Sequence, residues 1–420
     1  MMAPRPVLKP LDDALAELLA FARPLAGVER VSTFDADGRV LAQDIVSALQ
    51  VPPQDNSAMD GYALRCADVR QPGAQLTVTQ RIAAGSAGAP VHAGCAARIF
   101  TGAPIPAGAD AVVMQEDCEL PGRLLPSGQS TSDTPMLRVN MVPEPGQWIR
   151  RAGEDVRRGS IVLARGQRLT PAGLGLAASV GMDRLDVACR PRVALFSTGD
   201  ELVMPGDVAP ADMRPGAIYN SNRFFLRALL LRLGCAVTDM GIVPDQRAAT
   251  VDALRAASLQ HDLVLTSGGV SVGEEDHIKP AVLALGKLDL WQIAIKPGKP
   301  FAYGSVGPAH FIGLPGNPVS SFVTFLLLVR PFLLSLQGMQ DVGTSTVPMR
   351  ADFDWPKADR RREFLRVRRN ARGGLDRFAN QTSGVLTSVV WGDGLVDNPP
   401  DKTIARGDSV PFIAFSALFS

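Results

Sequence analysis

The chain has 420 residues, of which 46% are hydrophobic and 20% charged, so it can fold into three or four globular domains. Its formal net charge of +1 argues against a generally basic nucleic-acid binder and leaves room only for a local basic patch. The five cysteines are scattered and lack the spacing of a metal knuckle, which predicts reduced, buried thiols.

The first predicted element is a helix over residues 11–23. Leu11, Leu15, Leu18 and Leu19 recur there at helical spacing and form one apolar stripe. Prolines and acidic residues around this segment do not match a signal peptide. We therefore expect a cytoplasmic protein with neither a membrane nor a nucleic acid as a partner.

From about residue 28 to residue 150 the pattern changes to short apolar runs separated by glycine and proline turns. Residues 76–85 (LTVTQRIAAG) and 109–117 (ADAVVMQED) are examples. This texture predicts strands in one or two small sheets. Residues 121–135 are rich in Pro, Gly, Ser and Thr and predict an exposed loop.

Strand and helix patterns then alternate from about residue 190 to residue 336, which predicts a parallel sheet covered on both faces. Ligands of such sheets bind beyond the carboxyl ends of the strands. The predicted strands are 193–197, 236–243 and 262–267, and the predicted helices are about 222–233, 246–260 and one after residue 277.

The most apolar stretch of the chain, residues 319–336, predicts a buried helix. Arg330 and Pro331 interrupt it, and it is too short to be expected to span a bilayer. Beyond it, residues 362–369 (REFLRVRR) and 410–415 (VPFIAF) predict short strands of a small C-terminal β domain.

A glycine-rich loop follows the third predicted strand, at residues 266–277 (TSGGVSVGEEDH). Gly268 and Gly269 can adopt positive φ and let the backbone approach a ligand closely. Ser267, Ser271 and the backbone N–H groups can then donate to phosphate oxygens. The alternative is a tight turn that binds nothing.

Carboxylates gather at the same predicted edge of the sheet. Acids beside a phosphate site repel the ligand unless a cation lies between them, and such hard oxygen ligands suit Mg²⁺. The alternative is that they only cap the next helix or favour turns. They are Asp200 and Glu201 after the first strand, Asp245 after the second, and Glu274, Glu275 and Asp276 after the third.

Two lysines lie on a stiff Pro-Gly-Pro frame at residues 295–304 (IKPGKPFAYG). Two fixed ammonium groups, Lys296 and Lys299, suit a multiply charged oxyanion. The next loop, residues 313–322, carries Asn317 and Pro318 as a helix start. Its first turn can bind an anion through free N–H groups, or the pair can serve only as a cap.

Two segments outside the predicted sheet domain are ordinary loops by local reasoning. Asp60 lies beside Gly61 in the first, and Thr101 precedes Gly102 in the second. No Ser-His-Asp or Cys-His signature is visible, and the four histidines have no ligand spacing, which argues against zinc catalysis.

Together these motifs resemble the molybdopterin molybdenumtransferase (MoeA) family, whose relatives include the E domain of gephyrin. Eight stretches follow the family order between residues 55 and 321, and REFLR is the clear match further on. The eight are DNSAMDGYA, RIFTGAPIPAGADAVVMQED, RAGEDV, ALFSTGDELV, GAIYNSNR, TSGGVSVGEEDH, IKPGKPFAYG and GLPGNPVS.

The resemblance implies a multidomain α/β plus β protein and an elongated homodimer. A three-layer, parallel-sheet molybdopterin-binding domain would be joined by an extended β-rich domain, a helical linker domain and a small C-terminal β-barrel. The expected bounds are 1–27 with 150–189 for the discontinuous linker and dimerisation domain, 28–149 for the β-rich domain, 190–336 for the molybdopterin-binding domain and 337–420 for the barrel.

The resemblance also implies an activity in molybdenum cofactor biosynthesis. The family takes adenylylated molybdopterin and molybdate and, with Mg²⁺, releases AMP and the molybdenum cofactor. A molybdopterin adenylyltransferase would deliver the precursor, and molybdoenzymes would accept the product. A non-catalytic molybdopterin-binding scaffold and a Mg²⁺-dependent nucleotide hydrolase are the alternatives. An arginine cluster over 360–372 could bind RNA, but a solvated strand face or part of an anion site explains it better.

The predicted site residues combine these motifs with the family pattern. Asp60 and Thr101 would reach the partner subunit's site, and Gln292 departs from the lysine that bacterial relatives often carry. The catalytic set is Asp60, Thr101, Asp155, Glu201, Asp276 and Lys296. The cofactor-binding set is Ser267, Gly268, Gly269, Ser271, Pro315, Gly316, Asn317 and Pro318. Molybdate would bind Lys299, Ser320, Arg366 and Thr387 or Ser388. Mg²⁺ would bind among Asp200, Glu201, Asp245 and Asp276.

Overall fold

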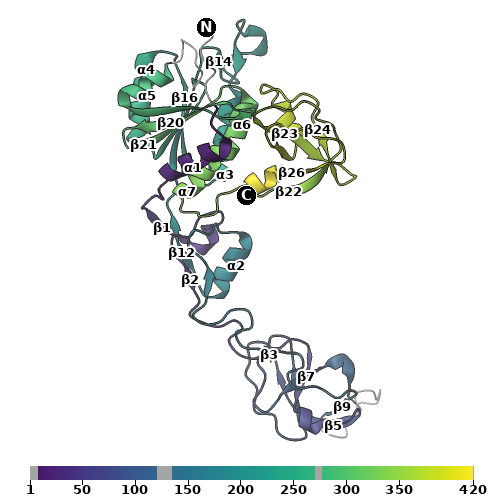
Figure 1. Ribbon diagram of the computed structural model, residues 1–420. Coiled ribbons are helices and arrows are strands. Elements are labelled where there is room, and N and C mark those ends of the chain that lie inside the picture. Colours follow the sequence, from purple (N-terminus) through teal and green to yellow (C-terminus); the bar gives the residue numbers. More distant parts are fainter. Residues whose placement is uncertain (1–7, 121–134, 270–276, 420) are drawn as a thin grey trace. The chain divides into compact units, whose positions relative to one another are not determined.

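The computed structural model describes residues 8–120, 135–269 and 277–419 (Figure 1). The chain forms two compact units, and each is considered by itself. The first comprises Met1–Gln43, Arg165–Thr170 and Arg184–Ser420, and the second comprises Asp44–Ala164 and Pro171–Asp183. The finer division into four domains stays a prediction.

A sheet of six described strands forms the centre of the first unit, in the order β16-β13-β17-β21-β20-β18. The first four strands run parallel, and β20 and β18 extend the sheet by antiparallel pairing. The predicted parallel sheet is therefore confirmed. The strands are β13 (Arg192–Thr198), β16 (Ala236–Val243), β17 (Leu263–Ser267), β18 (Gly286–Gln292), β20 (Pro300–Val306) and β21 (Ala309–Leu314).

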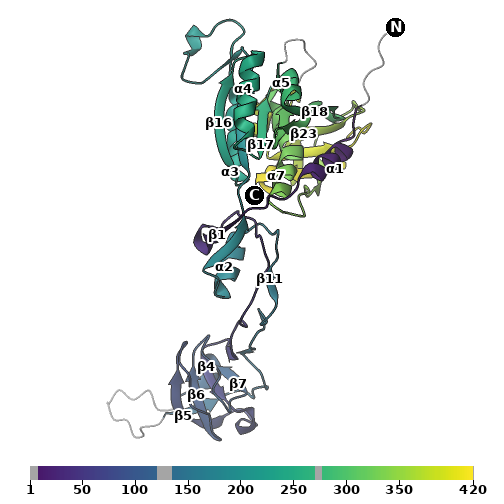
Figure 2. The ribbon, with the colours of Figure 1, turned by 90° about the vertical axis from the view of Figure 1, so that its left-hand side faces the viewer.

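Helices cover both faces of this sheet (Figure 2). They do so because its central strands are apolar on both sides. Val193 and Leu195 of β13 join one buried cluster, whereas Ala194 and Phe196 join the other. The first cluster includes side chains of α1 (Leu11–Phe21) and α3 (Ser221–Arg232), and the second includes those of α4 (Arg247–Ser258) and α5 (Ile278–Leu285). The result is the expected three-layer arrangement.

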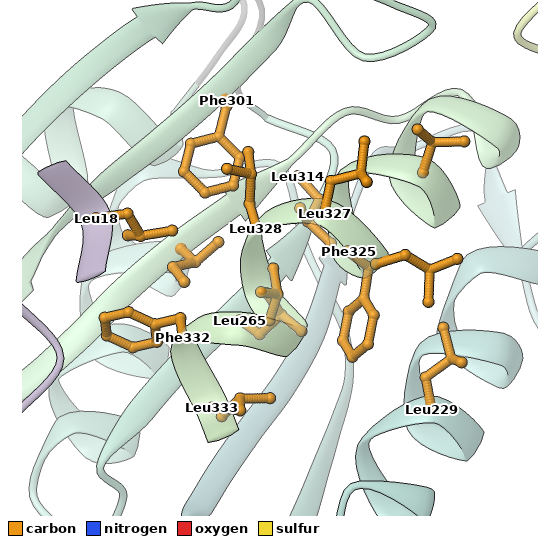
Figure 3. Close-up of a cluster of buried hydrophobic side chains, with 14 of the residues drawn as sticks. Leu18, Leu229, Leu265, Phe301, Leu314, Phe325, Leu327, Leu328, Phe332 and Leu333 are labelled. Carbon is orange, nitrogen blue, oxygen red and sulfur yellow. The ribbon is translucent and has the colours of Figure 1, made fainter. Parts of the chain in front are cut away.

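One helical run in the described part of the chain, Pro318–Leu336, has the length and hydropathy of a membrane span, with a mean hydropathy of 1.9. In its most apolar 18-residue window 94% is buried inside the protein, as predicted for a core helix. Its segments are α6 (Pro318–Thr324), the π-helical η5 (Phe325–Val329) and α7 (Arg330–Leu336). Figure 3 shows its apolar side chains packed with those of α1 and α3.

The C-terminal part of the first unit is a closed barrel of five described strands, in the order β23-β24-β22-β26-β25 with β25 pairing back to β23. A two-residue strand from the sheet region, β19, adds to β23 in parallel. The expected small barrel is confirmed. The elements are β19 (Ile295–Lys296), β22 (Val347–Ala351), β23 (Arg362–Arg369), β24 (Gly374–Arg377), β25 (Gly394–Asn398), β26 (Ser409–Ala414), α8 (Thr387–Trp391) and α9 (Phe415–Phe419).

The remaining elements of the first unit are short. Strands β1 and β12 pair antiparallel, and β14 pairs with β15 in parallel just before α3. They are β1 (Val28–Ser32), η1 (Thr33–Asp35), β12 (Arg184–Ala188), β14 (Leu202–Val203), η4 (Pro210–Asp212) and β15 (Ile218–Tyr219).

The second unit is built on a sheet of six described strands in the order β7-β4-β6-β5-β9-β8, consistent with the predicted β-rich texture. Its two faces bury separate apolar clusters. The elements are β2 (Ile45–Val46), β3 (Asn56–Ser57), β4 (Gly61–Leu64), η2 (Cys66–Asp68), β5 (Ala74–Ile82), β6 (Cys95–Ile99), β7 (Ala111–Met114), η3 (Gln115–Asp117), β8 (Cys118–Glu119), β9 (Met136–Val139), β10 (Ile149–Arg150), β11 (Ile161–Leu163) and α2 (Pro171–Ser179).

Candidate functional site

A cavity of about 780 Å³ lies at the carboxyl ends of the parallel strands in the first unit. This is the edge where ligands of parallel sheets bind. Loops after β13, β16, β17 and β21 contribute to it, together with the start of α3. Its lining residues are Thr198, Gly199, Glu201, Leu202, Ile218, Tyr219, Asn220, Ser221, Asn222, Asp245, Ser267, Gly268, Gly269, Pro300, Pro315, Gly316, Asn317, Pro318, Ser320 and Gly384.

The glycine loop after β17 has the backbone conformation that its sequence predicted. Gly268 and Gly269 have φ angles of 94° and 68°, which residues with a Cβ rarely adopt. A Cβ on Gly269 would lie 2.4 Å from Cγ1 of Ile278 and 3.0 Å from Oγ1 of Thr198. Both glycines therefore let the backbone form the wall of the cavity. Ser271 and Asp276 lie outside the described residues.

Asn222 joins two loops of the cavity. Its side-chain amide donates to Oγ of Ser267 at 2.8 Å and to the carbonyl oxygen of Gly316 at 2.7 Å. The side chain is buried, so these bonds compete little with water. Sequence reasoning assigned it no role, because a helical asparagine gives no sign of which distant loops it contacts.

Asn220 provides a buried donor with no partner among the described residues. It is 2% exposed, its Oδ1 accepts from the backbone N–H of Arg223 at 3.3 Å, and its Nδ2 has no hydrogen bond. Buried polar groups are seldom left unpaired. Since Asn220 lines the cavity, its amide is placed to donate to a ligand. Asn220 is the N-cap of α3, and an Asn close to a predicted helix start is a sequence signal for the cap alone.

Two of the predicted metal-binding carboxylates line the cavity. Glu201 follows β13 and Asp245 follows β16. Asp200 is exposed and is not part of the lining. Within the described residues there is no group of three or more His, Cys, Asp or Glu side chains that could hold a metal ion.

The start of α6 closes another side of the cavity. Asn317 precedes Pro318 as predicted, but its side chain makes no capping hydrogen bond and lines the cavity instead. The backbone N–H of Val319 donates to the carbonyl oxygen of Ser383, which attaches a barrel loop to the helix start. Ser320 is buried and belongs to the cavity lining.

The two lysines of the Pro-Gly-Pro loop have different surroundings. Lys296 Nζ lies 2.9 Å from Oε1 of Glu363, which is buried, and 3.4 Å from Oδ2 of Asp359. The Trp355 indole donates to the same Glu363 carboxylate at 2.7 Å. No side-chain partner is recorded for Lys299 in the described part of the chain. The charge of Lys296 is thus largely compensated by the barrel.

Arg366 is a buried guanidinium with no carboxylate ion pair in the described residues. It donates to the carbonyl oxygens of Phe364 at 3.0 Å and Thr382 at 3.3 Å, and to Oγ of Ser388 at 3.2 Å. Burial lowers the pKa of Arg366 to about 10. Of the two hydroxyls considered beside it, Ser388 is in contact, whereas Thr387 is exposed at the first residue of α8.

In the second unit, Asp60 and Thr101 form a specific pair although they lie 41 residues apart. Both the backbone N–H and the hydroxyl of Thr101 donate to Oδ1 of Asp60 at 2.8 Å. The backbone hydrogen bond, followed by the hydroxyl, lowers the pKa of Asp60. Asp155 is exposed, and its backbone N–H donates to the carbonyl oxygen of Val51. Within the described part of the second unit, no hydrogen bond or ion pair joins Asp155 to the Asp60 pair.

Comparison with known families matches three successive regions of the chain. Residues 9–181 match the MoeA N-terminal region (domain I and II). Residues 194–335 match a probable molybdopterin binding domain, and residues 348–415 match the MoeA C-terminal region (domain IV).

Individual relatives agree with these matches. A molybdopterin molybdenumtransferase from Haemophilus influenzae is 43% identical over 335 residues, 79% of this chain and 78% of that protein. Molybdopterin molybdenumtransferase 2 from Mycobacterium tuberculosis is 34% identical over 401 residues, 92% and 94% of the two chains. The crystal structure of a molybdopterin biosynthesis MoeA protein from Pyrococcus horikoshii has a TM-score of 0.82, 29% identity, and coverage of 97% of this chain and 100% of its own.

Proposed function

Because the chain belongs to the MoeA family of molybdopterin molybdenumtransferases, enzymes of molybdenum cofactor biosynthesis, we propose that it inserts molybdate into adenylylated molybdopterin and releases AMP. The observation that carries this proposal is the polar cavity at the carboxyl edge of the sheet. A glycine loop, a helix start and the unpaired Asn220 amide line it together. The N–H groups of Gly268 and Val319 already donate to the carbonyl oxygens of Leu314 and Ser383. The Gly269 N–H and the Asn220 amide are therefore the described donors that suit the phosphate oxygens of a nucleotide-linked substrate.

The donor set of this cavity fits a hard divalent cation. Mg²⁺ usually takes one or two carboxylates and completes its shell with water and substrate phosphates. Glu201 and Asp245 would be those carboxylates, with Asp276 as a further candidate and Asp200 at the rim. When bound, Mg²⁺ would compensate the negative charge of the pyrophosphate and of the departing AMP.

The chain's own residues would hold the phosphate groups of the substrate in a fixed orientation. Asn220 and the backbone N–H of Gly269 would hold phosphate oxygens in place, since the N–H of Gly268 already donates to the carbonyl oxygen of Leu314. Asn222 would keep the Ser267 and Gly316 loops at a fixed separation. Since Lys296 is already paired with Glu363, it would fix the lysine loop against the barrel more than neutralise the substrate. No protein nucleophile is required for the transfer.

Molybdate, the second substrate, would bind where cationic donors lack carboxylate partners. Lys299 and Arg366 have none among the described residues, and Arg366 is buried beside Ser388. Neither Lys299 nor Arg366 is among the lining residues of the polar cavity, whereas Pro300, next to Lys299, and Ser320 are. Charge-assisted donors in a partly desolvated setting bind oxyanions more strongly than surface lysines do. This assignment favours Ser388 over Thr387 as the nearby hydroxyl.

The proposal includes a homodimer, in which Asp60 and Thr101 would act at the active site of the other subunit. Their support is the paired, ionised carboxylate at Asp60, which is exposed and therefore accessible to a ligand. Mixing Asp60→Ala with Asp245→Ala protein should restore activity in heterodimers. A mixture that remains inactive after verified subunit exchange would contradict the shared site.

Lys299→Ala tests the assignment of the oxyanion site. A charge-assisted contact is worth about 1.5–3 kcal/mol, so apparent molybdate affinity should fall about 10- to 150-fold. Binding of adenylylated molybdopterin should change little. Lys287→Ala is the matched control, because Lys287 is an exposed lysine of β18 outside the cavity lining. The assay follows AMP release while molybdate and the pterin substrate are titrated separately.

The result can contradict the proposal in two ways. If affinity for the pterin substrate collapses while the molybdate requirement is unchanged, Lys299 holds the phosphate instead. If AMP is released equally well from a nucleotide substrate that lacks the pterin, the protein is a nucleotide hydrolase and molybdate insertion is not its function.

A further inference from the structure

A second cavity, of about 460 Å³, adjoins the polar one and is almost entirely apolar. It lies between α3, α6 and the barrel helix α8. Tyr219 and Ser221 line both cavities, which are therefore contiguous. We call this second cavity the apolar groove, and its lining is Pro205, Tyr219, Ser221, Phe224, Phe225, Phe322, Leu386, Val389 and Val390.

The helix α3 continues from one cavity into the other. Residues three and four apart share a helix face, which places Ser221, Phe224 and Phe225 together. Asn222 lies on the buried face and holds loops of the polar cavity. A ligand bound at the start of α3 could thus extend along the helix onto the two phenylalanines.

Packed aromatic rings form part of the wall of the groove, and some of its apolar surface is exposed. Phe225 packs edge-on against Phe322 at 5.7 Å, and Phe322 packs edge-on against Phe415 at 5.5 Å between ring centroids. Phe224 is 54% exposed and Val390 is 82% exposed. Large apolar side chains gathered at an exposed groove beside a polar site commonly mark a ligand contact.

We propose that the apolar groove receives the adenine ring of the adenylylated substrate, with the ring against Phe224. This inference rests on the proposed function, which supplies the nucleotide. A flat ring linked to phosphate needs a polar pocket and an adjoining apolar surface, and the two contiguous cavities provide that combination. Stacking on an aromatic side chain binds a base without requiring specific hydrogen bonds.

The chemistry of the groove favours adenine over the pterin ring. The Tyr219 hydroxyl already donates to the carbonyl oxygen of Val208 at 2.7 Å. Ser221 is then the remaining polar side chain in the lining. A pterin carries an amine, a carbonyl and ring N–H groups that would lose partners in such a site, whereas adenine can stack and leave its edge toward water.

The test compares AMP with ribose 5-phosphate, which lacks the base, on the full-length protein by titration calorimetry. Wild-type protein should bind AMP more tightly, and the ratio of the two dissociation constants measures the contribution of the base. Phe224→Ala should reduce that ratio about 5- to 150-fold, the range for one base–aromatic stack. Phe224→Leu should give a smaller reduction, and ribose 5-phosphate affinity should not change.

Leu231→Ala is the matched control, because Leu231 is a 44% exposed apolar residue of the same helix outside the groove lining. It should leave the ratio unchanged. If wild type binds neither ligand, both the inference and the proposed nucleotide substrate fail. If AMP binds but Phe224→Ala leaves the ratio unchanged, this inference alone is wrong.

Two other occupants of the groove would also overturn the inference. If Phe224→Ala binds molybdopterin more weakly but keeps the wild-type ratio of the AMP and ribose 5-phosphate dissociation constants, the pterin ring occupies the groove. If Phe224→Ala differs from wild type in mass by light scattering while the ratio of the AMP and ribose 5-phosphate dissociation constants is unchanged, a second copy of the chain covers the groove.

Discussion

Replacement of Asn222 by alanine would remove the link between two loops of the polar cavity and leave every residue of the predicted cofactor-binding set in place. The amide donates to Ser267 Oγ at 2.8 Å and to the Gly316 carbonyl at 2.7 Å. In Asn222→Ala both acceptors lose a buried donor, and the two loops are no longer connected. We expect the cavity to lose its fixed width and its affinity for AMP to fall.

The size of this effect follows from the two hydrogen bonds. Each is worth about 0.5–1.5 kcal/mol net, so the variant should lose about 1–3 kcal/mol in total. If that loss is expressed in ligand binding, the dissociation constant for AMP should rise about 5- to 150-fold. Asn222→Asp should not rescue binding, because a carboxylate keeps the shape but cannot donate to either acceptor.

Asn370→Ala is the control for general destabilisation. The Asn370 Nδ2 also donates two bonds, to the carboxylates of Asp352 and Asp376 at 2.9 Å, and its Oδ1 accepts from the backbone N–H groups of Arg372 and Gly374. Asn370 lies in the barrel outside the cavity lining, so its loss should destabilise the fold at least as much as the loss of Asn222. Urea unfolding and AMP titration would be measured on both variants. A loss of stability in Asn222→Ala with its AMP affinity unchanged would refute its role in positioning the loops.

Three further predictions concern charged residues. Molybdate at 100 times its dissociation constant should stabilise wild-type protein by about 2.7 kcal/mol but not Arg366→Met. Since the pKa of Arg366 falls only to about 10, the cost of burying its charge applies below pH 10 and is relieved above it. Thermal unfolding at pH 7 and pH 10.5 checks both statements. Glu363→Gln should cost about 1.5–3 kcal/mol in urea unfolding, since it removes the anionic partner of Lys296, and an unchanged midpoint would contradict this. Because Thr101 lowers the pKa of Asp60, their bond stabilises the fold above pH 3.8 and is lost as pH falls through the lowered pKa. Thr101→Val should move the Asp60 titration upward in NMR, and an unmoved curve would contradict the hydroxyl's contribution.

Local pattern was sufficient to predict much of the first unit. Strand β16 spans the predicted residues 236–243, and α3 begins one residue before the predicted 222. The spacing of apolar residues within a short window is visible in the sequence, so strands and helices can be predicted from it without knowledge of the fold. The positive φ of Gly268 and Gly269 followed from the same local logic.

Other features of the site depend on contacts between distant parts of the chain. Lys296 meets Glu363, 67 residues away, and no local pattern indicates that the charge of this lysine is compensated. Asn317 has the residue type of a helix cap but makes no capping bond. Family resemblance implied only that Asp60 and Thr101 act at one site, and their pairing with each other was not predicted. Such contacts follow from tertiary packing, which propensity and spacing do not encode.

The parallel pairing of β19 with β23 has a practical consequence for dissecting this protein into fragments. Ile295 and Lys296 precede the core helix in sequence, yet they pair with Arg362 and Glu363 of the barrel. A recombinant fragment ending at Leu336 would expose the backbone of β19, and one beginning at Val347 would leave the start of β23 as an open edge. Open strand edges promote association with other chains. Expression of the two fragments together, or of the first unit's C-terminal portion as one piece from residue 184, would preserve the pairing.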